Sequence, residues 1–172
     1  NEIAADENYG LLAGHLLEDK QYYKAFKTYQ NLLQFYEKSN NAITIPQELY
    51  RMGDLIMVMP DSSLQNLNIP VQNRYSESML YLKKGLDLAK EQKNLLQEAA
   101  LLKAISKNME SQHKYDDAFK AYKEYIILKD SISGDEVQKK LNRSEIQYEF
   151  DKKEIALKYE KQLSDELLNK EQ

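Results

Sequence analysis

The chain has 172 residues and a formal net charge of -4 at pH 7, with 42% hydrophobic and 30% charged residues. This length suits one compact domain with an appendage, and the negative balance gives no general attraction to nucleic acid or to anionic lipid. Cysteine is absent, which excludes disulfides, thiolate metal ligands and cysteine nucleophiles. No run of about 18 apolar residues occurs, so we expect no membrane contact within the chain.

Apolar residues recur at helical spacing through most of the chain, and only five Gly and three Pro interrupt it. The pattern predicts helices over 6–19, 22–38, about 46–59, 74–91, 94–111 and 115–130. Residues 60–73 contain Pro60 and Pro70, and we expect a loop there. A break at 133–135 precedes a last, long and charged helix, which we expect over most of 135–170.

One phrase of sequence occurs twice. Residues 22–32 read YYKAFKTYQNL and residues 115–125 read YDDAFKAYKEY, with a weaker copy over 75–85. Recurrence at a spacing of tens of residues indicates a repeat architecture. Repeat proteins commonly provide extended binding surfaces.

The positions of small residues in this pattern resemble the tetratricopeptide repeat (TPR) family. Each repeat of that family is a helix pair with small residues where the two helices touch, and the matching pairs here are Ala13 with Ala25, Gly53 with Ser78, and Ser106 with Ala118. The large apolar positions that line each first helix hold Tyr9, Leu12 and Leu16, then Leu49, Met52 and Ile56, then Leu102, Ile105 and Met109. Ser78 stands where the family usually has alanine.

The resemblance implies an all-α fold, a TPR-like α–α superhelix over 1–132 followed by a long C-terminal helix over 133–172. Its three helix pairs would span about 6–39, 46–92 and 94–132, with the 60–73 loop inserted between the helices of the middle pair. The alternative is an unrelated antiparallel helical bundle.

The expected C-terminal helix has a narrow apolar stripe. Leu141, Tyr148 and Ile155 recur at heptad spacing, and Val137 and Leu163 extend the stripe at helical steps. Acid-before-base pairs such as Glu154 with Lys158 support an exposed helix. Such a stripe suits a two-stranded coiled coil, so we expect these five apolar residues to mediate homodimerisation. The alternatives are a cap that packs back on the repeats and a solvated linker.

The order of repeats and helix is also similar to the sensor regions of membrane-bound signalling regulators of Bacteroides-type bacteria. The segments that carry this likeness are LKDS at 128–131, KKL at 139–141 and QYE at 147–149. The resemblance implies a sensory module of a two-component or transcriptional regulator, in the periplasmic or extracytoplasmic part of an inner-membrane protein, with a cytoplasmic location as the alternative. The first residue is Asn1, so we expect a processed or truncated product, with a transmembrane segment after Gln172 and an output domain beyond it.

Catalytic motifs are lacking, so we expect a non-catalytic protein without a cofactor or a metal. His15 and His113 are far apart in the sequence, and no His-Glu-x-x-His motif or Gly-rich phosphate loop occurs. Basic residues are not clustered with aromatic ones, so we expect no nucleic-acid partner for this fragment.

A protein or peptide partner is expected to bind the concave face that the first helices of such repeats line. Carried over position by position, the groove residues are Tyr50, Asp54, Met57, Lys103 and Lys107. The positions where the chaperone-binding branch clamps a peptide carboxylate hold Gly10, Gly14, Ala100 and Ala104, so that clamp is absent. Met57 also suits core packing. The alternative function is a structural scaffold or adaptor in which the last helix acts as a cap.

Overall fold

The computed structural model describes residues 2–39 and 41–132, together with 143, 146–147, 149–150, 153–154, 157–158 and 161, and for residues 2–8 it describes the backbone alone. All regular secondary structure in these residues is helical, which confirms the all-α class. The chain divides into two compact units, Asn1–Leu128 and Lys129–Gln172.

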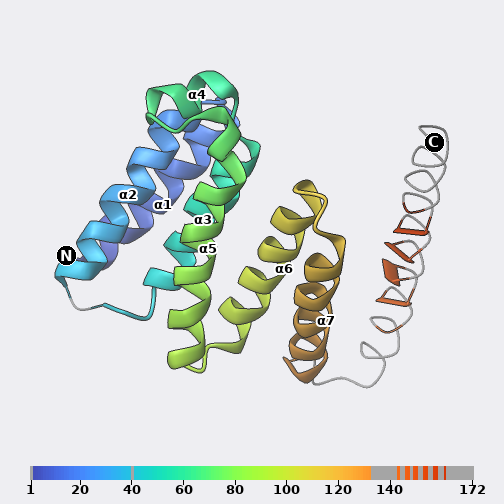
Figure 1. The fold of residues 1–172 in the computed structure, drawn as a ribbon. Helices are drawn as coiled ribbons and strands as arrows, with labels where there is room; N and C mark the ends of the chain where they lie inside the picture. Colours follow the sequence, from blue (N-terminus) through green and yellow to red (C-terminus); the bar gives the residue numbers. More distant parts are fainter. Residues whose placement is uncertain are drawn as a thin grey trace. The chain divides into compact units, whose positions relative to one another are not determined.

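Up to residue 132 the described structure consists of seven α-helices and one short 3₁₀ turn (Figure 1). Their bounds are α1 Glu2–Glu18, α2 Tyr22–Lys38, α3 Ile45–Val58, α4 Asp61–Asn66, η1 Val71–Asn73, α5 Arg74–Glu91, α6 Leu95–Ser111 and α7 Tyr115–Ile132. The six helices expected from periodicity before residue 133 are therefore present. The expectation of a loop over 60–73 was wrong in part, because α4 and η1 occupy most of it.

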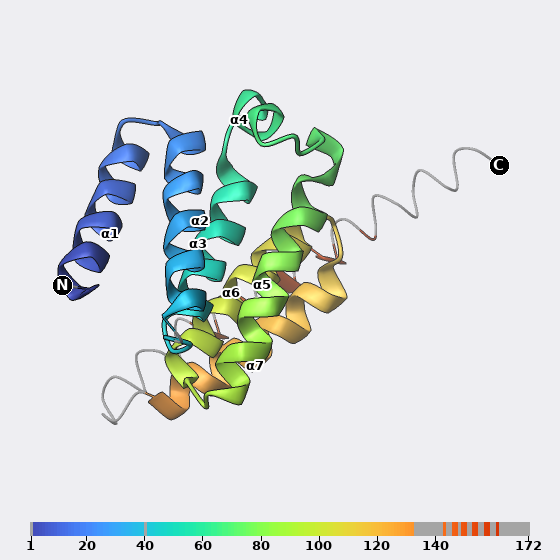
Figure 2. The ribbon, with the colours of Figure 1, turned by 90° about the vertical axis from the view of Figure 1, so that its left-hand side faces the viewer.

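The helices of the first unit pack largely on their neighbours in the chain. α1 packs on α2, α2 on α3, α3 on α5 and α5 on α6, and α3 also contacts α6. Figure 2 shows α1 at the outer edge of this row, with α2 between α1 and α3. One face of α1 therefore packs on α2.

The same backbone motif ends three of the long helices. Lys20, Lys93 and His113 follow α1, α5 and α6 in the left-handed conformation, with φ of 57°, 54° and 59°. In each turn the next residue donates its backbone N–H to a carbonyl of the last helical turn: Gln21 to Leu16 at 2.7 Å, Asn94 to Ala89 at 2.9 Å and Lys114 to Met109 at 2.9 Å. This is the Schellman arrangement, which satisfies the orphan carbonyls and reverses the chain.

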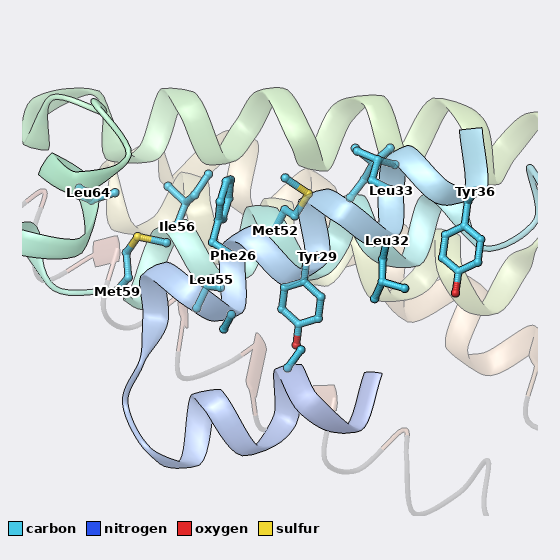
Figure 3. Close-up of a cluster of buried hydrophobic side chains, with 13 residues drawn as sticks. Phe26, Tyr29, Leu32, Leu33, Tyr36, Met52, Leu55, Ile56, Met59 and Leu64 are labelled. Atoms are coloured by element: carbon cyan, nitrogen blue, oxygen red, sulfur yellow. The ribbon is translucent and has the colours of Figure 1, made fainter. Parts of the chain in front are cut away.

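Two clusters of buried apolar side chains hold the first unit together. The first, here called the N-terminal core, joins α2 to α3 (Figure 3) and consists of Ala13, Ala25, Phe26, Tyr29, Leu32, Leu33, Tyr36, Leu49, Met52, Leu55, Ile56, Met59 and Leu64. The second, the C-terminal core, consists of Met57, Leu82, Ala89, Leu101, Ala104, Ile105 and Ala121. Leu64 anchors α4 to the N-terminal core, which explains why the insert folds onto the domain.

Small residues lie at close helix contacts in two successive pairs. A Cβ added to Gly53 of α3 would lie 2.7 Å from the side chain of Leu82 on α5. The Ser78 hydroxyl of α5 donates to the Gly53 carbonyl at 2.8 Å. On the next pair the Ser106 hydroxyl of α6 donates to the Ala118 carbonyl of α7, also at 2.8 Å. Both serines therefore bond across the helix contact.

Arg74, the first residue of α5, closes the insert. Its guanidinium donates to the carbonyls of Ile56, Met57 and Met59 at the C-terminal end of α3. It also pairs with the Asp61 carboxylate in the first turn of α4. A cation at the end of a helix satisfies its free carbonyls and complements the helix dipole, so Arg74 fixes where α3 ends and where α4 begins.

Candidate functional site

Tyr50 and Asp54 lie one turn apart on α3 and both are half-buried. Tyr50 packs against the C-terminal core. Burial raises the pKa of Tyr50, and the carboxylate of Asp54 raises it further. The phenol therefore keeps its proton at neutral pH and can donate a hydrogen bond beside a carboxylate acceptor.

Met57, the third expected groove residue on α3, is only 9% exposed. Its side chain belongs to the C-terminal core, in the same cluster as Ala104 of α6. Met57 thus serves packing between α3 and α6, and a ligand on this surface would meet little of it.

Lys103 and Lys107 are exposed and lie one turn apart on α6. The Lys103 ammonium lies 5.7 Å from the centroid of the Tyr125 ring on α7, within the range of a cation–π contact. Because α6 contacts α3, the five expected groove residues come from two neighbouring helices. Four of them offer polar groups: one phenol, one carboxylate and two ammonium groups.

A buried polar network that sequence reasoning did not find lies next to this surface. Asn108 of α6 is fully buried, and its amide nitrogen donates to the Tyr75 carbonyl and to the Ser78 hydroxyl, both at 3.0 Å. Its amide oxygen accepts from Gln112 at 2.6 Å. Since Ser78 in turn bonds Gly53 of α3, the network links α3, α5 and α6. Ser78 in the place of alanine and an Asn within the expected helix 94–111 were the sequence signals for it.

A second polar cluster joins α2 to α3. Arg51 donates to the buried Glu48 carboxylate at 3.0 Å, and its guanidinium lies 5.6 Å from the centroid of the Tyr29 ring. Burial raises the pKa of Tyr29, while Arg51 lowers it and Glu48 raises it. Arg51 therefore contacts both Glu48 and Tyr29, and Tyr29 belongs to the N-terminal core, so the three side chains serve to hold α2 on α3.

The two histidines occupy separate exposed turns. His15 lies 3.4 Å from the Glu18 carboxylate, and His113 lies 2.8 Å from the Tyr115 hydroxyl. Within the described ranges, no group of three or more His, Asp or Glu side chains could hold a metal ion. In the same ranges, every helix is too short or too polar to span a bilayer.

The expected dimerisation residues Val137, Leu141, Tyr148, Ile155 and Leu163 lie outside the described residues. One expected ion pair of this segment is present, because the Lys158 ammonium lies 2.8 Å from the Glu154 carboxylate. The hydrogen bond to Glu154 raises the pKa of Lys158.

Comparison of the chain with models of known protein families, with curated proteins and with solved structures gives no match.

Proposed function

We propose that the chain is a non-catalytic interaction module of three TPR-like helix pairs. The pairs are α1 with α2, α3 with α5, and α6 with α7. The module binds a protein or peptide, and the C-terminal helix mediates dimerisation or relays a signal. On this proposal it is the sensory region of a bacterial signal-transduction or transcriptional regulator.

The observation that carries the proposal is the recurrence of one contact along the chain. Gly53 with Ser78 and Ser106 with Ala118 are both small-residue contacts closed by a serine hydroxyl. The helix order also repeats, since α2 packs on α3 and α5 packs on α6. The serine donor lies on the second helix of one pair and on the first helix of the other, so what recurs is a small-residue contact at matching positions. This recurrence favours repeats over an unrelated bundle.

The groove of the proposal is the polar surface on α3 and α6. Tyr50 and Asp54 there offer a donor and an acceptor, and Lys103 and Lys107 offer two cations within one helical turn. This set suits a peptide with acidic side chains or a free carboxylate. Selection of a phage-displayed random peptide library on the full chain tests the surface.

Acidic peptides should be enriched in that selection, and the double variant Lys103→Glu with Lys107→Glu should lose them. The matched control is Lys83→Glu with Lys90→Glu on exposed positions of α5, which should retain them. Equal binding by both variants would remove Lys103 and Lys107 from the site.

Dimerisation through Leu141 and the other stripe residues is tested by sedimentation equilibrium. The chain should be a dimer at micromolar concentration, and Leu141→Glu should make it a monomer. A wild-type monomer at high micromolar concentration would contradict the relay and favour the second candidate, a scaffold or adaptor in which the C-terminal helix is a cap.

The extracytoplasmic location is a further part of the proposal. Sequencing the gene beyond Gln172 tests it, because a sensor region should continue into a hydrophobic span of about 20 residues and an output domain. A complete gene without such a span would exclude this location for the module.

A further inference from the structure

Tyr125 of α7 lies beside one of the two groove lysines. α7 packs on α6 (Figure 1), and the Ser106 hydroxyl donates to the Ala118 carbonyl across this contact. About one turn further along α7, Ala121 belongs to the C-terminal core. Tyr125 follows after one more turn, so helical spacing places it on the same face of α7. Its side chain is half-buried, and it is therefore held next to α6.

The two groove lysines differ in what their ammonium groups contact. The Lys103 ammonium lies 5.7 Å from the centroid of the Tyr125 ring, within cation–π range. The Lys107 ammonium, one turn further along α6, has no hydrogen bond, ion pair or ring contact with the described residues. Both side chains are exposed, so the ring of Tyr125 is what distinguishes them.

The ring of Tyr125 is itself supported by a second ring. Its centroid lies 5.6 Å from that of the Tyr122 ring on the same helix, within the range of aromatic pairs. The ring that faces Lys103 thus has both a helix contact and an aromatic neighbour to keep it in place.

A lysine held in this way is better prepared to bind an anion. A free lysine side chain samples many rotamers, and fixing one of them on binding costs free energy. A ring that already holds the ammonium reduces this cost. The ring covers one side of the ammonium, and N–H donors on its other sides stay available to a carboxylate.

We infer that Tyr125 is a positioning residue of the peptide site: its ring holds the Lys103 ammonium where it meets an acidic side chain of the bound peptide. The site then extends from α3 and α6 onto α7. This inference rests on the proposed function, because it concerns the same groove.

Nuclear magnetic resonance of the full chain without peptide tests the contact. Protons above an aromatic ring resonate upfield, so the ε-methylene protons of Lys103 should lie upfield of those of Lys107. The displacement should persist in Tyr125→Phe, which keeps the ring, and disappear in Tyr125→Leu. The Lys103→Gln variant assigns the resonances by their loss.

Binding of fluorescein-labelled hexaglutamate to the full chain, followed by fluorescence anisotropy at low salt, tests the role. Tyr125→Leu should weaken binding about two- to fivefold, the size of one exposed cation–π contact. Tyr125→Phe should bind as the wild type does. Lys103→Gln should weaken binding at least as much as Tyr125→Leu, because it removes the charge itself. Circular dichroism of each variant checks that the helices remain.

A pair of double-mutant cycles separates positioning from a general effect on α7. In the Lys103→Gln background, Tyr125→Leu should have almost no further effect on the affinity, because the ring then has no ammonium to hold. In the Lys107→Gln background, the matched control, Tyr125→Leu should keep its full about two- to fivefold effect. A merely structural role of Tyr125 would weaken binding equally in both backgrounds.

Failure of the inference and failure of the proposed groove give different results. The inference is wrong and the groove stands if Lys103→Gln weakens binding while Tyr125→Leu acts equally in the two lysine backgrounds. Coincident ε-methylene resonances of Lys103 and Lys107 in the wild type would also overturn the inference. Absence of hexaglutamate binding by the wild type at millimolar concentration would overturn both the groove and the role of Tyr125 in it.

Discussion

Replacing Asn108 by alanine tests whether the buried polar network holds α3, α5 and α6 together. Asn108 is fully buried and makes three side-chain hydrogen bonds, to the Tyr75 carbonyl, the Ser78 hydroxyl and the Gln112 amide. Alanine removes all three and leaves the helix backbone unchanged, so the change in stability reports the network.

The expected cost follows from the fate of each partner. A buried hydrogen bond contributes about 1 kcal/mol net, so losing three costs about 3 kcal/mol. Ser78 still donates to Gly53 at 2.8 Å, and the partly exposed Gln112 side chain can bond to water. Because both partners keep another hydrogen bond, the loss of stability should not exceed this sum by much. Removing the buried amide also leaves a small void, which adds to the loss.

Urea unfolding followed by far-UV circular dichroism measures the change. The midpoint should fall while the slope of the free energy against urea stays the same. The control is Ser111→Ala on the same helix, where an exposed hydroxyl donates to the Lys107 carbonyl at 3.0 Å. That bond is exchanged for one with water, so its loss should change stability by about 0.5 kcal/mol or less.

A double-mutant cycle separates the network from simple packing. Combined with Ser78→Ala, Asn108→Ala should show a coupling energy of about 0.5 kcal/mol or more, because the two side chains bond directly. A single-variant cost equal to that of Ser111→Ala, or strict additivity in the cycle, would refute the role assigned to Asn108.

Three further predictions use matched changes. Gly53→Ala should destabilise the domain by about 1–3 kcal/mol, because the new Cβ would lie 2.7 Å from the buried Leu82 side chain. Gly14→Ala, with open space around the new Cβ, should instead stabilise the domain by roughly 0.5–1 kcal/mol. Thermal or urea denaturation measures both changes, and equal effects of the two variants would contradict the close contact at Gly53. Arg74→Met should speed amide hydrogen exchange across 56–73, because three carbonyls and Asp61 lose their donor. It should lower the free energy of unfolding by about 2 kcal/mol. Lys84→Met removes only an exposed 3.6 Å ion pair with Glu37 and should lower the free energy of unfolding by less than about 1 kcal/mol. Burial raises the pKa of Tyr29, Tyr50 and Tyr81, so the stabilisation from their neutral phenols is complete below pH 10 and is lost as the pH rises through the folded pKa values. The free energy of unfolding should therefore fall above pH 10. An equal fall in a variant with all three tyrosines replaced by phenylalanine would refute this.

The positions of the long helices followed from local signals in the sequence. Apolar residues such as Phe26, Tyr29 and Leu33 recur at helical spacing, and Pro46 suits a first helical turn. The phrase that contains Ala25 and Ala118 also placed small residues that are buried in the structure. Such signals are local, so one sequence suffices to detect them.

The features that sequence reasoning did not find depend on contacts between distant residues. Arg74 bonds carbonyls of residues 56–59 and the carboxylate of Asp61 only because the insert folds back on α3. Leu64 gives α4 an anchor in the N-terminal core, and a six-residue helix has little stability by itself. Neither contact leaves a periodic pattern.

Ser78 replaces the alanine expected at this repeat position, and the structure gives a physical reason for the serine. At a close helix contact alanine fits by size alone, and the sequence presented serine there as an exception. In the structure its hydroxyl donates to Gly53 and accepts from Asn108, so serine satisfies a buried amide that alanine would leave short of one partner. Ser78 and Asn108 are therefore coupled, and alanine at 78 would leave Asn108 with only its bonds to the Tyr75 carbonyl and to Gln112.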